Sequence, residues 1–173
     1  MRAVFFTSDW ENIVSNLKAD EFFNFDCKDN ETLKLKLRDL ASKGMKELFI
    51  FGNCEALDPS AGIKARIITD HINATGDNPL IGPNDDSAGP RFPDMTFAYS
   101  EKLTSELRNF LRSSGISFSE SVLYGADAFP AEPDELDKLN SLNCTVRDKT
   151  TVWLDILARH AGIEVGAVVR TVG

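Results

Sequence analysis

A fold of the α/β class, built on one largely parallel sheet, is predicted for this chain of 173 residues. Short apolar runs that are typical of buried strands alternate with segments whose apolar residues recur at helical spacing. No linker, internal repeat or low-complexity tract separates these segments. Because alternating strands and helices form a parallel sheet with helices on both faces, we expect residues 1–173 to form a single domain.

The strands are predicted from short apolar runs that end in turn residues. The first ends in Thr7-Ser8-Asp9, and the third is expected to end in a turn at residues 52–55. The complete set of predicted strands is residues 2–6, 21–25, 47–51, 63–71, 121–124, 144–147 and 164–172.

The helices are predicted from apolar residues three or four positions apart, which share one helix face. Ser8 and Glu11 have the spacing of a capping box at the start of the first helix. Gly44, Gly115 and Gly162 are placed to end three of the helices. The predicted helices cover residues 10–17, 30–41, 99–111, 133–142 and 151–161.

Residues 73–96 break this regularity. They contain four prolines and three glycines, and a loop of that length inside a compact domain is usually functional or disordered. Leu80, Ile81, Phe92 and Met95 supply apolar surface inside it. We therefore expect the loop to pack against another part of the protein or a partner.

The composition disfavours several function classes. Nineteen Lys and Arg residues against 27 Asp and Glu residues give a formal net charge of −8, and this field would repel a polyanion. We therefore expect no binding to DNA or RNA, whereas a single nucleoside or phosphate still fits a locally positive pocket. No stretch approaches the roughly 20 apolar residues of a membrane span, so we expect a soluble protein.

Cysteine and histidine usage indicates the compartment and the absence of a metal. Cys27, Cys54 and Cys144 are odd in number and far apart, which predicts neither a disulfide framework nor a zinc site and fits a reducing cytoplasm. With only two histidines, His71 and His160, a metal site has no support.

A specific motif lies between Asp70 and Tyr99. It reads Asp70-His71-Ile72-Asn73, then Gly76-Asp77-Asn78-Pro79-Leu80-Ile81-Gly82-Pro83-Asn84-Asp85, then Gly89-Pro90-Arg91-Phe92-Pro93-Asp94-Met95, and Ala98-Tyr99. This ordered set resembles the central signature of the trimeric purine nucleoside phosphorylases. Weaker similarity covers the Thr7-Ser8 turn, residues 52–59 and residues 158–162, so the resemblance touches most of the chain.

The resemblance implies a three-layer α/β/α fold around a central mixed sheet. It also implies a homo-trimer, in which the signature loop packs against a neighbouring subunit; a heteromer with a full-length phosphorylase is the alternative. The implied reaction is phosphate attack on the sugar carbon of a purine nucleoside, with phosphate as co-substrate and no cofactor. The expected interface residues are His71, Asn78, Pro79, Leu80, Ile81, Asn84, Asp85 and Phe92.

By the same resemblance, Ser8, Asn53 and Thr150 are candidates for phosphate binding. Ser8 lies at a strand-to-helix turn, where free amides and the helix dipole favour an anion, although helix capping alone also explains a serine there. Asn53 lies in the expected turn whose backbone amide would meet phosphate. Thr150 matches a second hydroxyl of the family, and a role only as a helix N-cap is the alternative.

Phe129 and Glu132 are the candidates for nucleoside binding. Phe129 matches the aromatic residue that stacks on the purine in the family. Glu132 stands two residues after Pro130, which occupies the position of a base-binding glutamate. The alternative for Glu132 is an exposed charge near the start of a helix.

Other positions depart from the family pattern, so no catalytic residue is assigned. Lys149 replaces a methionine that packs on ribose, Gly173 replaces a purine-binding asparagine, and Ala88 replaces an aromatic residue that the loop lends to its neighbour. A stretch that carries an arginine, a histidine and a tyrosine in the family is missing between Phe25 and Asn30.

Three hypotheses follow. The departures fall on the chemistry while the loop is kept, which favours a catalytically degenerate member with a partial pocket. An active but divergent phosphorylase or nucleosidase is the second hypothesis, and a binding module that senses a nucleobase or phosphate is the third. In each, His71 is expected to order the loop, and His160 to place a cation in the last turn of its helix.

Overall fold

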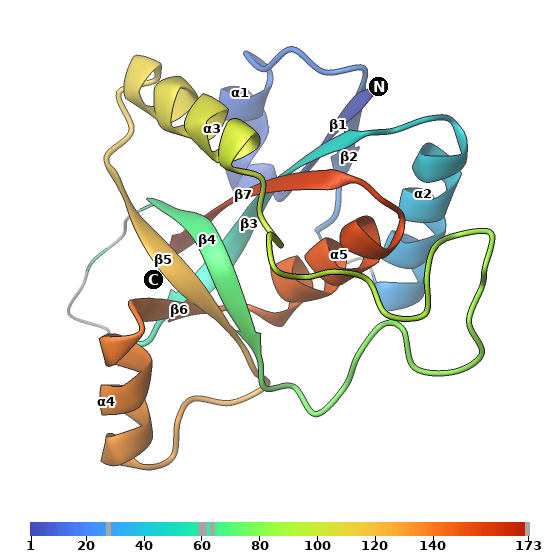
Figure 1. Cartoon of the computed structure of the whole chain (residues 1–173). Helices are drawn as coiled ribbons and strands as arrows, with labels where there is room; N and C mark the ends of the chain where they lie inside the picture. The colour runs from blue at the N-terminus through green and yellow to red at the C-terminus, as the bar shows by residue number, and fades with distance from the viewer. Residues whose placement is uncertain (27–28, 59–61, 63–64, 172–173) are drawn as a thin grey trace.

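The computed structural model describes residues 1–26, 29–58, 62 and 65–171. Within these residues, seven strands form one sheet (Figure 1). They are β1 (Arg2–Phe6), β2 (Glu21–Asn24), β3 (Glu47–Ala56), β4 (Ala65–Asn73), β5 (Phe118–Gly125), β6 (Cys144–Arg147) and β7 (Glu164–Thr171). The α-helices of the described residues are α1 (Glu11–Val14), α2 (Asn30–Ser42), α3 (Glu101–Ser113), α4 (Pro133–Ser141) and α5 (Lys149–His160). Some positions used above lie outside the described residues: Cys27, Pro59, Ile63, Val172 and Gly173.

The sheet is mixed and largely parallel, as predicted. Strand β3 pairs in parallel with β1 and β7, and β5 pairs in parallel with β4 and β6. The antiparallel pairs are β3 with β6 and β4 with β7. The pairings β3–β7–β4–β5–β6–β3 therefore close a ring of five strands, and β1 and β2 extend it on one side.

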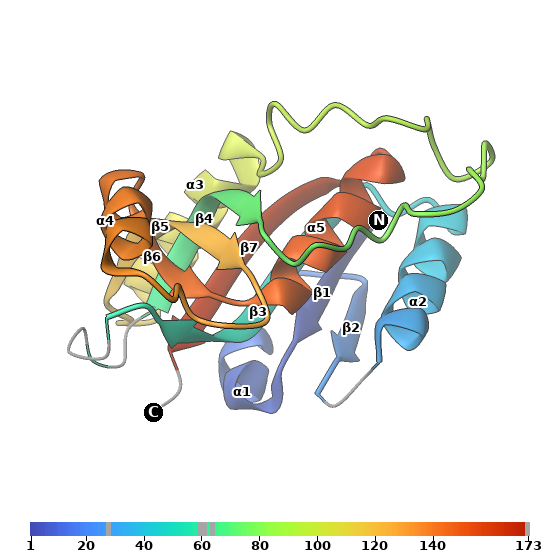
Figure 2. The ribbon, with the colours of Figure 1, turned by 90° about the horizontal axis from the view of Figure 1, so that it is seen from below.

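Helices cover both faces of the sheet, which confirms the three-layer arrangement (Figure 2). On one face, α2 and α5 pack over a core that includes Leu33, Leu37 and Ile50. On the other face, α1 and α3 pack over Phe49 and Phe51. Helix α4 packs against a smaller cluster beside β5 and β6.

The expected turn at residues 52–55 is wrong, because β3 continues as a strand to Ala56. Parallel pairing with β7 reaches Cys54, and antiparallel pairing with β6 then takes over at Glu55 and Ala56. A glycine at position 52 permits a close approach of α5, since a Cβ there would lie 3.1 Å from Oγ1 of Thr151.

Two helix starts also differ from the prediction. Ser8 does not form a capping box with Glu11; its Oγ accepts from Nδ2 of Asn24, and a 3₁₀ turn over Ser8–Trp10 precedes a short α1. The N-cap of α5 is Asp148, whose carboxylate accepts from the amides of Thr150 and Thr151. Thr150 therefore lies inside the first turn and is not the cap.

The irregular loop after β4 runs alongside α5 and reaches α2 in both views (Figures 1 and 2). Leu80 and Met95 pack against the core, and Pro79 is buried. In contrast, Ile81 and Phe92 are 70% and 86% exposed. The loop is thus attached to its own subunit by some of its apolar residues, while others remain on the surface.

Candidate functional site

A polar cavity of about 390 Å³ lies where the carboxyl ends of β3, β5 and β6 meet. Strands β5 and β6 are parallel, so the segments that follow them leave at the same end. Strand β3 meets β6 only through its last residues and in the opposite direction, which brings a third carboxyl end to this place. The lining residues are Asn53, Cys54, Glu55, Ala126, Asp127, Arg147, Asp148, Lys149 and Thr150.

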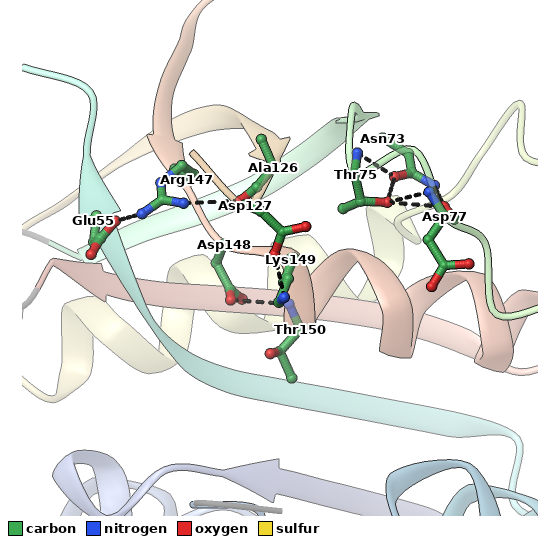
Figure 3. Close-up of polar contacts among 10 residues, drawn as sticks. All are labelled: Glu55, Asn73, Thr75, Asp77, Ala126, Asp127, Arg147, Asp148, Lys149 and Thr150. Carbon is green, nitrogen blue, oxygen red and sulfur yellow. Dashed lines mark hydrogen bonds and ion pairs between the residues drawn. The ribbon is translucent and has the colours of Figure 1, made fainter. Parts of the chain in front are cut away.

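Arg147, the last residue of β6, is held on several sides (Figure 3). Its guanidinium is ion-paired with Glu55 across the β3–β6 pair and donates to the carbonyl of Ala126 at 3.0 Å. The ring centroid of Phe129 lies 4.5 Å from its Cζ atom. A guanidinium at this distance over an aromatic face gains a cation–π contact.

The start of α5 forms another wall of the cavity. Lys149 is ion-paired with Asp127, and both side chains are more than half exposed (Figure 3). Partial burial of Asp148 raises its pKa, while the amides of Thr150 and Thr151 favour its charged form. Two amides at the start of α5 thus donate to Asp148 and not to a ligand.

Donors in and beside the turn after β1 are likewise hydrogen-bonded to acidic side chains. The backbone amide of Ser8 donates to Oδ2 of Asp26 at 2.8 Å. The side chain of Asn53 joins this turn to the cavity, because its Nδ2 donates to Asp9 at 2.7 Å and its Oδ1 accepts from Thr7 at 3.2 Å. The indole of Trp10 fixes the turn on β3 through a buried hydrogen bond to the carbonyl of Gly52 at 2.9 Å.

The structure therefore brings some of the predicted site residues together and leaves others apart. Asn53 and Thr150 line the same cavity, although Asn53 does so from a strand and not from a turn. Ser8 lies outside the lining and is linked to it through the turn. Phe129 is 49% exposed and touches the site through Arg147. Glu132 is exposed at the N-cap of α4 and does not line the cavity.

Arg147 and Glu55 are functional candidates that the sequence did not reveal. Arg147 is a charged residue at the end of an apolar strand, directly before a helix cap, and this is the signal that could have identified it. Glu55 falls in the turn predicted at residues 52–55, and its pairing with Arg147 depends on the register between β3 and β6.

The predicted interface residue His71 belongs to a second, buried cluster. Its Nδ1 lies 3.3 Å from the hydroxyl of Tyr99 and 3.5 Å from Oδ2 of Asp155, which is fully buried. Burial lowers the pKa of His71 and raises that of Asp155, so it favours the neutral form of each side chain. His71 also lines a mostly apolar cavity of about 410 Å³ beneath the loop, with Leu80 and Ile81.

The environment of the other histidine disfavours the cation that was expected at the end of α5. His160 is buried, and this burial lowers its pKa below the usual value. Its carbonyl lies only 1.8 Å from where a Cβ of residue 89 would be, so Gly89 lets the loop touch the end of α5. Remaining predicted interface residues are placed on the loop surface: Asn78, Asn84 and Asp85, the last of which pairs with Arg38 at 3.8 Å.

Within the described part of the chain, no group of three or more His, Cys, Asp or Glu side chains is arranged to hold a metal ion. Cys54 and Cys144 are free and buried, and burial raises their thiol pKa to about 12 and about 11. Neither thiol is therefore a ready nucleophile at neutral pH. None of the helices in the described ranges has the length and apolar content that a bilayer crossing requires.

Comparison with known proteins places these features in a family. Residues 31–172 match the family described as the phosphorylase superfamily. Purine nucleoside phosphorylase 1 of Geobacillus stearothermophilus is 37% identical over 135 residues, which are 75% of this chain and 48% of that protein. Purine nucleoside phosphorylase 1 of Bacillus subtilis is 41% identical over 101 residues, which are 57% of this chain and 37% of that protein.

The fold is shared with solved structures. A schistosoma purine nucleoside phosphorylase in complex with hypoxanthine superposes with a TM-score of 0.77 at 22% identity, over 97% of this chain and 75% of that chain. Against the two bacterial relatives, in contrast, the chain spans less than half of their length.

Proposed function

This chain belongs to the phosphorylase superfamily, and on that premise we propose that it binds a purine nucleoside or its base without catalysing phosphorolysis. The ligand would occupy the cavity at the carboxyl ends of β3, β5 and β6, beside Arg147 and Thr150. No cofactor enters this proposal. Phosphate is the co-substrate that a phosphorylase uses, and its binding is the step that we infer to be impaired.

The observation that carries the proposal is that the donors near the cavity are bonded to carboxylates of the chain itself. The amide of Ser8 donates to Asp26, and Nδ2 of Asn53 donates to Asp9. The two cations that line the cavity, Arg147 and Lys149, are ion-paired with acidic side chains. A phosphate dianion would have to displace these carboxylates and lie beside them, and like charges at such short range are costly.

A neutral nucleoside does not meet this obstacle. The cavity volume of about 390 Å³ is within the range of small-molecule sites, and its polar lining offers both donors and acceptors. A base can also stack on the guanidinium of Arg147, which is already fixed against Phe129. These features support binding of the nucleoside without its co-substrate.

The test is a calorimetric titration of the purified protein with inosine, hypoxanthine and inorganic phosphate. We expect binding of inosine or hypoxanthine and much weaker binding of phosphate. If none of the purines binds, the proposal is wrong.

An active phosphorylase is the second candidate. The observation in its favour is that Asn53, Thr150, Arg147 and Lys149 share one cavity. If phosphate replaced the carboxylate partners of the two cations, charge-assisted hydrogen bonds would hold it. Release of base from inosine in the presence of phosphate would support this candidate.

We also propose that the chain assembles as a homo-trimer through the loop after β4. Ile81, Phe92 and Phe97 of this loop are 70%, 86% and 76% exposed. Apolar side chains gathered on one loop mark a contact surface more often than a free one. His71 and Tyr99 hold the base of this loop on its own subunit, so the loop can present a fixed surface to a neighbour.

A further inference from the structure

One turn of the long loop packs on the carboxyl end of α5. In this turn, residues 84–89, the amides of Ala88 and Gly89 donate to the carbonyl of Asp85 at 2.9 Å and 3.3 Å. A Cβ atom at position 89 would lie 1.8 Å from the carbonyl oxygen of His160 and 3.3 Å from its ring. His160, the last residue of α5, is therefore in direct contact with the backbone of the turn.

The other contacts of this turn are more exposed. Nδ2 of Asn84 donates to the carbonyl of Gly89 at 3.2 Å, which closes the turn on itself. The carboxylate of Asp85 lies 3.8 Å from the guanidinium of Arg38 on α2, and both side chains are more than 40% exposed. Because an exposed ion pair stabilises little, we infer that the attachment of the turn depends mainly on its contact with His160.

The surroundings of His160 disfavour a charge on its ring. The residue is 5% exposed, and its Nε2 atom is buried without a hydrogen-bond partner in the described ranges. Burial lowers its pKa most, and Arg38 and Lys34 on α2 act in the same direction. Asp85 and the backbone of Gly89 act in the opposite direction but do not outweigh them.

Separation of the turn from α5 would remove much of this penalty. The ring would lose the cover of Gly89 and gain contact with water, so its pKa would return toward the usual value of about 6.5. The attached form thus binds a proton more weakly than the separated form. Attachment is therefore fully favoured above about pH 6.5 and weakens as the pH falls below that value.

We propose that the contact between residues 84–89 and α5 is a pH-sensitive attachment of the loop. Neutral His160 holds the turn, and protonation of its ring releases the turn while the sheet stays folded. Ile81 and Phe92 flank the turn and are largely exposed, so its release would also loosen the surface that they form. The inference does not depend on nucleoside binding, because neither the turn nor His160 lines the cavity at β3, β5 and β6.

A contact that does not respond to pH is the alternative. Gly89 fits closely against α5, and close packing alone would keep the turn attached until the whole chain unfolds. The two possibilities differ in whether residues 84–89 open in mild acid before the rest of the protein does.

The test is hydrogen exchange with mass spectrometry at about pH 7.5 and about pH 5.5, with rates corrected for the intrinsic effect of pH. For wild-type residues 84–89 we expect up to about a tenfold loss of protection at the lower pH, since the separated form is then about nine-tenths protonated. In His160→Gln, which cannot ionise, this loss should disappear. His71→Gln is the matched control, because it removes the only other histidine of the sequence and should keep the loss.

Three results would overturn the inference. The first is equal or greater protection of residues 84–89 at the lower pH in the wild-type protein. The second is a loss of protection that persists in a folded His160→Gln variant. The third is an NMR titration of the wild-type protein in which the His160 ring has a pKa at or above about 6.5, since attachment of the turn would then not oppose its protonation.

Discussion

Asp26 holds the amide that the family resemblance assigns to phosphate. Its Oδ2 accepts from the amide of Ser8 at 2.8 Å, and Nδ2 of Asn24 donates to Oγ of Ser8 at 2.8 Å. Both polar groups of Ser8 are thus engaged by neighbours from the end of β2. The carboxylate of Asp26 thus accepts the hydrogen bond that the Ser8 amide would otherwise donate to a bound anion.

We therefore predict that Asp26→Asn strengthens phosphate binding. The substitution removes a negative charge next to the Ser8 amide, and relief of the like-charge repulsion should raise the affinity for phosphate by about tenfold, or about 1.4 kcal/mol. Calorimetry with inorganic phosphate measures this change. Asp137→Asn removes one charge at a distant, exposed position and should leave the affinity unchanged; an equal gain in both variants would show only an effect of net charge.

The family resemblance indicated part of this site. Asn53 and Thr150 do lie at one cavity, because the family resemblance carries their positions in the chain. The partners of Ser8 and Arg147 could not be predicted, since they come from residues 18 and 92 positions away in the sequence. Such contacts depend on how β2 and β3 are paired, which local sequence patterns do not contain.

At the scale of the elements, α5 places one acidic residue in the protein core. Asp155 is fully buried beside His71, and neither of its oxygens has a hydrogen-bond partner among the described residues. The other titratable groups whose charges act on this cluster are Tyr99 from the loop, Asp70 from β4, Asp148 at the N-cap of α5 and Arg159 from α5. Burial raises the pKa of Asp155 and lowers that of His71, so the folded state favours the neutral forms.

This arrangement predicts a pH dependence of stability. An acid with a raised folded pKa contributes stability below its unfolded pKa of about 3.9, and that contribution is lost as pH rises through the folded value. Asp155→Asn cannot ionise, so we expect it to be more stable than the wild type at pH 8, by about 1–3 kcal/mol, and similar to it at pH 4. The histidine acts in the opposite sense, since its lowered pKa removes stability as pH falls below about 6.5 in both proteins.

Urea unfolding of the wild type and Asp155→Asn across this pH range measures the difference. A difference in unfolding free energy that does not grow with pH would mean that Asp155 is charged in the folded protein. Asp137→Asn, which removes an exposed carboxylate, controls for general charge effects.

Element positions were predictable where apolar runs and glycines mark them, as for β1 and α2. The end of β3 was not, because Gly52 and Asn53 are turn residues by composition and are held in the strand by β7. The start of α5 was misassigned for a related reason. Asp148 and Thr150 are both acceptable N-caps, and only the backbone geometry distinguishes them.

At the scale of the whole molecule, the fold class was predictable because strands and helices alternate throughout the chain. The closure of five strands into a ring was not, since it depends on two antiparallel contacts between distant segments. That closure is what gathers three carboxyl ends around the cavity. The long loop runs along α5 (Figure 1), and no residue of this loop lines the cavity.

The proposed trimer gives a prediction at this scale. Phe92 is the most exposed of the loop's apolar residues, and we expect Phe92→Ser to convert the trimer into monomers at micromolar concentration. Light scattering coupled to size exclusion measures the mass. Leu142→Ser, which changes an exposed apolar residue beyond α4, should keep the trimer mass. A monomer mass for the wild-type protein at every concentration would contradict the assembly.

The proposed function requires that this site, whose donors are bonded to carboxylates of the same chain, does not catalyse phosphorolysis. The direct measurement is the release of hypoxanthine from inosine in excess phosphate, followed for the wild-type protein beside an enzyme-free blank. We predict release at the rate of the blank, together with inosine binding in the same preparation. Release well above the blank that is lost in Asn53→Ala or Thr150→Ala would contradict the account and establish an active phosphorylase.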